Sequence, residues 1–95
     1  MDVYKIPIAK KAEMEKILAM DQVFRLSITI KDSSILGESG YQYLVLEGTE
    51  ERLRIAREEL TKISEKIDKS LEEKVKQMIE KERQDVYDSF GSVFG

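Results

Sequence analysis

Alternating apolar and polar positions dominate the first half of the chain. They predict three strands, over residues 3–8, 24–31 and 41–47, in which apolar side chains recur at every second position. Between the first two strands, Met14, Ile17 and Leu18 fall at helical spacing and predict a helix over residues 10–20. The expected order of elements is therefore strand, helix, strand, strand.

A helical repeat takes over in the second half of the chain. Thr49 is a favourable N-cap, and neither glycine nor proline occurs between Gly48 and Gly91. The pattern predicts one helix from Thr49 to about Phe90, and the first part of this helix is expected to lie on the sheet. The positions expected to face the sheet are Leu53, Ala56, Leu60, Ile63 and Ile67.

A second interpretation divides this helix. The residues Ser70-Leu71-Glu72-Glu73 form a capping-box pattern, which can begin a new helix after a break at Asp68 or Lys69. The distal segment would then fold back onto the protein. Because neither glycine nor proline marks the break, we expect a continuous or merely bent helix.

A continuous helix would extend well beyond the rest of the protein. Its length would be about 60 Å, roughly twice the span of the small sheet unit. The distal half would carry an apolar stripe without cover, and such patches usually mark partner surfaces. The sequence therefore predicts a homo-oligomer, a dimer or larger, that does not enter a membrane. The association surface is expected at Leu71, Val75, Met78, Ile79, Val86 and Phe90.

These elements predict the α+β class, with a ferredoxin-like βαββα order, an antiparallel sheet and helices on one face. The C-terminal helix is expected to be long, with Ser70 as the place of a break if there is one. The usual fourth strand of that fold has no convincing counterpart in the sequence. We expect residues 1–67 to form the βαββα unit, residues 68–90 a helical extension for association, and residues 91–95 a flexible tail.

The composition narrows the possible chemistry. The chain has 95 residues, enough for one domain, and it contains neither cysteine nor histidine. The usual zinc, iron–sulfur and copper sites are therefore excluded, as are Cys–His and Ser–His–Asp catalysis. Neighbouring carboxylates on the predicted helix do not share a face, so they do not converge on a metal or a substrate. We expect a non-enzymatic protein with no catalytic residues, no metal and no cofactor.

Charge and hydropathy bear on partners and location. The net charge of −3 is not that of a generic nucleic-acid binder. Charged residues make up 37% of the chain, and asparagine and tryptophan are absent as well, a bias that indicates a thermophilic source. No apolar run approaches the length of a membrane span, and the N-terminus does not resemble a signal peptide. We therefore expect a cytoplasmic location.

One face of the predicted sheet is left to polar and aromatic side chains. Tyrosines among arginine and lysine on an open sheet are the ingredients of a stacking platform for single-stranded RNA. They are equally the ingredients of an oligomer interface between sheets, and a plain solvated face is a third interpretation. A small effector held at a dimer interface is a further alternative. The candidate residues on this face are Arg25, Lys31, Tyr41 and Tyr43.

Two short resemblances to known families add expectations. Residues 43–51, continuing through Ala56, resemble the final strand and helix of KH RNA-binding domains, and residues 37–40 have the spacing of their GxxG loop. In that family the loop joins two helices, whereas here it lies between two predicted strands and has no basic side chain in the middle. The βαββ order is also similar to that of ACT-type regulatory domains. The first resemblance implies RNA binding, and the second implies pairing through sheets.

Overall fold

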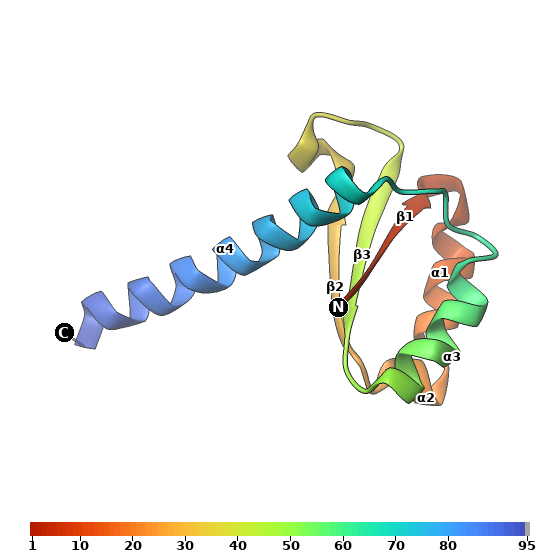
Figure 1. Ribbon diagram of the computed structural model, residues 1–95, viewed down its shortest axis with the longest axis horizontal. Helices are drawn as coiled ribbons and strands as arrows, with labels where there is room; N and C mark the ends of the chain where they lie inside the picture. Colours follow the sequence, from red (N-terminus) through yellow and green to blue (C-terminus); the bar gives the residue numbers. More distant parts are fainter. Residues whose placement is uncertain (95) are drawn as a thin grey trace.

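The computed structural model describes the backbone of residues 1–94 and the side chains of residues 1–84. It is an α+β fold in which a three-stranded antiparallel sheet lies between two helical layers (Figure 1). The strands β1 (Asp2–Pro7), β2 (Ser27–Asp32) and β3 (Tyr41–Glu47) are arranged in the order β1-β3-β2. The expected α+β class is confirmed, and the part of the chain described here has no fourth strand in the sheet.

The central strand, β3, is buried on both faces. It pairs antiparallel with β1 and with β2, so that Tyr4 and Ile30 lie on either side of Leu44. Because successive side chains of a strand point to opposite faces, Leu44 and Leu46 face one helical layer while Tyr43 and Val45 face the other. All four residues from Tyr43 to Leu46 are buried.

The first helical layer consists of α1 (Lys11–Leu18), α2 (Asp21–Phe24) and α3 (Glu50–Leu60), with short 3₁₀ turns η1 (Ile8–Lys10) and η2 (Ser33–Leu36) in the connections. Thr49 caps α3 as expected, because its hydroxyl accepts a hydrogen bond from the backbone N–H of Arg52. The layer covers one face of the sheet. This first core consists of Tyr4, Ile6, Met14, Ile17, Val23, Leu26, Leu44, Leu46, Leu53, Ala56 and Leu60.

The second strand begins later than the alternation predicts. Phe24 was expected at its start, but it ends α2 and its side chain is 69% exposed. The neighbouring Val23 is fully buried, and the backbone N–H groups of Val23 and Phe24 both donate to the carbonyl of Met20. Burial of Val23 in the first core therefore stabilises a helical turn here. An alternating pattern of four residues does not reveal this competition.

The helix predicted from Thr49 to about Phe90 is divided in two. Helix α3 ends at Leu60, and α4 runs over Lys69–Phe94. The expectation of a continuous or bent helix is therefore wrong. A second helix does begin after Asp68, as the alternative interpretation expected, but the first helix ends at Leu60, well before that point. The new helix is capped by Asp68, whose carboxylate accepts the backbone N–H of Leu71 at 2.7 Å, rather than by Ser70.

The connection over residues 61–68 carries the chain around the edge of the sheet. Ile63 packs on the first core, whereas Ile67 packs on a second core on the opposite face. In a continuous helix these residues, four positions apart, would share one face. Burying both faces of the sheet therefore supplies the reason for the break, and no glycine or proline is needed.

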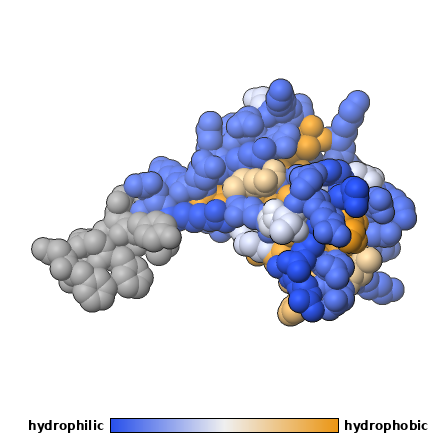
Figure 2. All heavy atoms as spheres, turned by 60° about the horizontal axis from the view of Figure 1, so that its bottom comes forward, coloured by the Kyte–Doolittle hydropathy of each residue, from blue (hydrophilic) through white to orange (hydrophobic). Residues whose placement is uncertain are grey.

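Helix α4 covers the sheet face that was expected to be open. Val75 and Ile79 are buried against Val3, Tyr43 and Val45, and this group is the second core. The expectation that the helices lie on one face is therefore wrong. After this contact α4 leaves the body of the protein, and its end lies far from the other elements (Figure 1). Figure 2 shows the compact body from a second direction, with mostly hydrophilic side chains at its surface.

Candidate functional site

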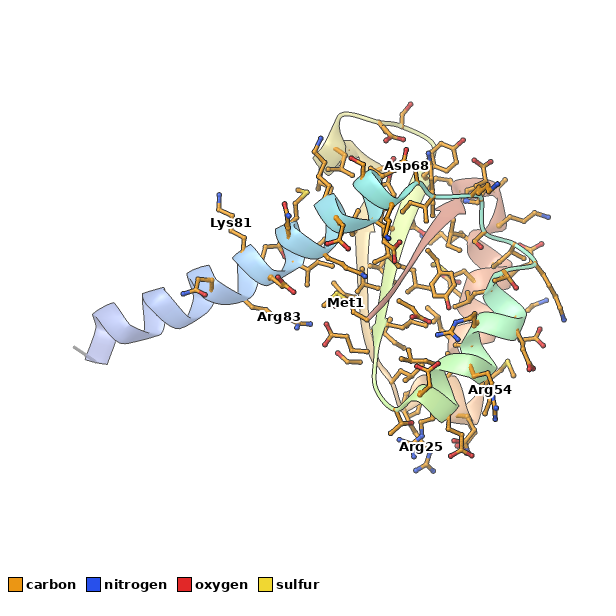
Figure 3. The ribbon with its side chains drawn as sticks, viewed as in Figure 1. Met1, Arg25, Arg54, Asp68, Lys81 and Arg83 are labelled. Carbon is orange, nitrogen blue, oxygen red and sulfur yellow. The ribbon has the colours of Figure 1, made fainter. Side chains whose placement is uncertain are left out.

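The structure brings together three of the four residues expected on an open sheet face, since Lys31 pairs with Tyr43 and Tyr41 lies two positions along β3, but it leaves Arg25 apart from them. Arg25 lies at the far end of the molecule from the start of α4 (Figure 3), where it is exposed and 3.7 Å from Asp21. Tyr43 is fully buried beneath α4. Lys31 reaches toward α4, and its Nζ lies 2.7 Å from a carboxylate oxygen of Glu82. A base-stacking platform that includes Tyr43 is therefore closed.

Tyr43 instead belongs to a polar cluster beside the β2–β3 connection. Its hydroxyl donates to Oε1 of Glu38 at 3.2 Å, and the other oxygen of Glu38 lies 3.3 Å from Nζ of Lys5. The same Nζ is 4.3 Å from the centre of the Tyr41 ring. Burial, helped by the Glu38 carboxylate, raises the pKa of Tyr43 to about 12. Glu38 occupies the first middle position of the GxxG spacing, and its carboxylate is engaged by Tyr43 and Lys5.

A second polar cluster fastens the start of β1 to α3. Oδ2 of Asp2 accepts from the Tyr4 hydroxyl at 3.1 Å and from Nε and Nη2 of Arg57 at 3.3 and 3.0 Å. Nη1 of Arg57 donates to Glu50. Burial raises the pKa of Tyr4 well above its usual value, which keeps the hydroxyl a donor. The charged and hydroxyl groups of this cluster form hydrogen bonds and ion pairs with one another, so we assign the cluster a structural role.

Two hollows border this end of β1. One has a volume of about 200 Å³ and lies between Asp2, Arg57 and Glu72, and the other has a volume of about 430 Å³ and lies between Val3 and the connection over residues 61–68. The larger hollow is lined by two hydroxyl residues, Thr61 and Ser64, and the Thr61 hydroxyl donates to the backbone carbonyl of Arg57. In the described part of the chain, no three carboxylates come close enough to bind a metal ion.

The chain uses the predicted association surface partly for its own fold. Val75 and Ile79 are buried in the second core, and Leu71 packs at its margin. Met78 is half-buried. These positions are therefore not the uncovered stripe that a continuous helix would have exposed. The remaining two, Val86 and Phe90, lie outside the residues whose side chains are described.

The outer edge of β1 is protected against pairing with a further strand. The backbone N–H of Glu65 donates to the carbonyl of Lys5 at 2.8 Å, so the backbone groups of Lys5 and its alternate neighbours point away from β3. Pro7 ends the strand and has no N–H to offer. The crossing connection and the proline both hinder the addition of another strand, as natural sheet edges often require.

The outer edge of β2 has neither a crossing connection nor a proline among the described residues. The even-numbered residues of β3 form their backbone hydrogen bonds with β1, so its odd-numbered residues form theirs with β2. The residues of β2 opposite the even-numbered positions, Ile28 and Ile30, therefore direct their backbone N–H and C=O groups away from β3. Within the described portion, no other segment donates to or accepts from these backbone groups. The Ile30 side chain is 42% exposed. We call residues 27–32 on this side of the sheet the β2 edge.

The second feature is the end of α4, whose backbone extends away from the body of the protein (Figure 1). Ion pairs from Glu82 to Lys31 and from Arg83 to Glu47, at 2.7 and 3.0 Å, tie the middle of the helix to the sheet. Figure 3 shows Arg83 directed back toward the body, with Lys81 pointing away from it. The helix continues to Phe94. We call residues 84–94 the α4 projection, and together with the β2 edge it forms the candidate functional site.

Comparison with known proteins gives no family for this chain. No protein-family model, curated protein or solved structure matches it. No helix among the described residues has the length and apolarity needed to cross a bilayer. The β2 edge and the α4 projection are therefore the features from which a function can be inferred.

Sequence reasoning missed the β2 edge. The alternation over residues 24–31 indicates which side chains share a face, but it does not indicate which strands end up at the borders of the sheet. That information comes from the strand order β1-β3-β2 and from the path of the connection around β1. The long helical repeat was the signal for the α4 projection.

Proposed function

We propose that the protein is a non-enzymatic interaction or regulatory module that works as a homo-oligomer, joined through the α4 projection. The observation that carries the proposal is the length of α4. Its 26 residues would span about 39 Å, the described side chains contact the sheet as far as Arg83, and the backbone beyond leaves the body of the protein (Figure 1). The α4 projection is therefore available to a partner.

The sequence of the α4 projection supports a helical contact with a partner. Val86 and Phe90 follow Ile79 by seven and eleven residues, which are spacings that return to the same face of a helix. A short helix without tertiary contacts is marginal in water, so a partner would supply stability as well as cover for these apolar residues. Symmetric pairing of two copies is the commonest way in which soluble chains associate.

The relationship to the ferredoxin-like fold is part of the same proposal. The order β1-β3-β2 agrees with the split βαβ arrangement of that fold. The connection over residues 61–68 runs beside β1, and its single bridge to Lys5 takes the place of a further strand. Nucleic-acid binding is not favoured, because Tyr43 is buried and the net charge is −3.

The solution mass of the chain tests this proposal. We expect light scattering after size exclusion to give a dimer or larger species, and Val86→Asp with Phe90→Asp to give a monomer whose body still unfolds cooperatively in urea. The matched control is Gln77→Asp with Lys81→Gln, which changes the net charge by the same two units at exposed positions of α4 outside the α4 projection. A monomeric wild-type chain across the accessible concentration range would overturn the proposal.

A further inference from the structure

We infer that the β2 edge pairs with the β2 edge of a second copy, in antiparallel orientation, so that two sheets join into one sheet of six strands. The inference rests on the proposed self-association and names a second surface that takes part in it. Strand addition at an open edge is an established mode of recognition, in which backbone hydrogen bonds provide the affinity. The contrast between the two edges of this sheet points to β2.

The two features that protect the β1 edge, a crossing connection and a proline, are missing at β2 among the described residues. The connection bonds to Lys5 of β1, and Pro7 closes its end. Strand β2 contains no proline, and its six residues pair with β3 without a bulge. Its one basic side chain, Lys31, forms an ion pair with Glu82 of α4, so it does not protect the edge as an unpaired charge would. The β2 edge is therefore able to accept a strand along its length.

The backbone restricts how two such edges can meet. Outward N–H and C=O groups belong to Ile28 and Ile30, so the new hydrogen-bonded pairs must involve these residues. Two copies related by a two-fold axis perpendicular to the sheet meet this condition in three ways. The axis lies next to Ile28, Thr29 or Ile30, and that residue then stands opposite the same residue of the second copy. An axis beside Ile30 would place Asp32 opposite an isoleucine, and an axis beside Ile28 would place Ile30 opposite Leu26, which lies before the strand and is buried.

An axis beside Thr29 gives the complementary register. It pairs Ile28 of each chain with the partner's Ile30, and it places the two Thr29 residues opposite each other. Cross-strand pairs of β-branched residues and of threonines are favourable in antiparallel sheets. The pairing also covers Ile30, of which 42% is exposed in one copy. This self-complementarity is the reason for choosing a second copy, rather than an unrelated extended peptide, as the occupant.

The two surfaces of the candidate site have complementary roles. A stable interface usually buries about 800 Å² on each partner, which is more than a strand of six residues supplies through one edge. The α4 projection adds the further contact area. The edge supplies the register, because a shift by one residue would place the outward backbone groups of one copy opposite residues of the other copy whose backbone groups already bond to β3.

Cysteine cross-linking tests the register directly. The chain has no cysteine, so one substitution introduces a single thiol. In the proposed register, Thr29 and the partner's Thr29 form a non-hydrogen-bonded pair with Cα atoms about 4.5 Å apart, a separation that a disulfide can span. We expect Thr29→Cys to give a disulfide-linked dimer under mild oxidation. Ser27→Cys is the matched control, because its two thiols would be about 13 Å apart along the strands and would link at least ten-fold more slowly.

A second variant keeps the test independent of thiol chemistry. Ile30→Lys places a charge at the β2 edge, and the exposure of Ile30 allows the substitution in one copy. We expect it to weaken dimerisation at least ten-fold. Its control is Ile35→Lys, since Ile35 is 39% exposed but lies in η2.

The outcomes separate the inference from the proposed function. A dimeric chain in which Thr29→Cys cross-links and Ile30→Lys dissociates would support both. A dimer that resists Ile30→Lys, with Thr29→Cys no faster to cross-link than Ser27→Cys, would overturn the β2 pairing and leave association through α4 in place. A monomeric wild-type chain without cross-linking at Thr29→Cys would overturn both.

Discussion

The backbone N–H of Glu65 donates to the carbonyl oxygen of Lys5 over 2.8 Å, at the point where the chain passes from one face of the sheet to the other. This single bridge joins the connection over residues 61–68 to the edge strand β1. On one side of it Ile63 packs with α1 and α3, and on the other Ile67 packs with α4. At this bridge the chain passes from the first core to the second, so that both faces of the sheet are covered by helices. The bridge lies at β1, and β2 is left as the open edge.

The packing of α4 on the sheet can be tested at Val75. This residue is fully buried against the sheet, and we expect Val75→Ala to lower the free energy of unfolding by roughly 2 kcal/mol through lost burial and an incompletely filled cavity. Urea denaturation measures the free energy of unfolding, and the comparison requires that the variants have the same m-value, the slope of that free energy against urea concentration. Gln77→Ala is the control on the exposed side of the same helix. Equal effects of the two substitutions would show that α4 does not dock on the sheet in solution.

Val75 also bears on how association should be probed. Val75 and Met78 belong to the association surface predicted from the sequence, so Val75→Asp with Met78→Asp is an obvious way to test for dissociation of an oligomer. In the structure, an aspartate at position 75 would place a carboxylate in the second core, which is costly without a partner. We expect this pair to destabilise the fold itself, as seen in a lower unfolding midpoint, so Val86 and Phe90 are the better positions.

The N-cap of α4 gives a second prediction. The Asp68 carboxylate accepts the backbone N–H of Leu71 at 2.7 Å. We expect Asp68→Ala to cost about 1 kcal/mol of stability, since an unsatisfied N–H is left at the start of the helix, and Asp68→Asn to retain most of it. Thermal unfolding followed by circular dichroism measures both. Loss of stability in Ser70→Ala instead would indicate that the capping box predicted from the sequence is used in solution.

Gly48 is required by a close approach. It lies between β3 and α3, and a Cβ added there would overlap Cδ2 of Leu26, whose side chain is buried in the first core. We expect Gly48→Ala to destabilise the protein by about 1–3 kcal/mol through overpacking. Gly37→Ala separates this effect from backbone strain alone, because Gly37 has a positive φ of 76° but open space around it. The two variants are compared by chemical denaturation, and a larger loss at Gly37 would contradict the overpacking argument.

Stability at alkaline pH depends on the buried tyrosines. Burial raises the pKa of Tyr43 from the usual value of about 10 to about 12. Between these values the unfolded chain loses the phenolic proton while the folded protein keeps it, so the free energy of unfolding is unaffected below pH 10 and falls as the pH rises toward 12. The decline should be shallower in Tyr43→Phe. Urea unfolding at pH 9, 10 and 11 checks it, and a Tyr43→Phe profile parallel to that of the wild type would contradict the assignment.

Part of the candidate site could be foreseen from the sequence. The helical repeat that continues past Ile79 indicates a helix longer than the sheet beneath it, and the structure gives α4 a backbone that extends to Phe94. The platform of Arg25, Lys31, Tyr41 and Tyr43 was expected to be open, and burial of Tyr43 closes it. Local periodicity identifies the face on which a side chain lies, but it does not identify what covers that face.

Local patterns in the sequence determined the α+β class, the extent of β3, the cap at Thr49 and the division of β3 into two faces, because a period of two or of 3.6 residues depends on near neighbours alone. Tertiary structure decided the rest. It broke the helical repeat between Ile63 and Ile67, placed α4 on the second face and ended α2 at Phe24. The physical reason is that burying both faces of β3 outweighs the local preference for an unbroken helix, and such long-range burial leaves no mark in the spacing of residues.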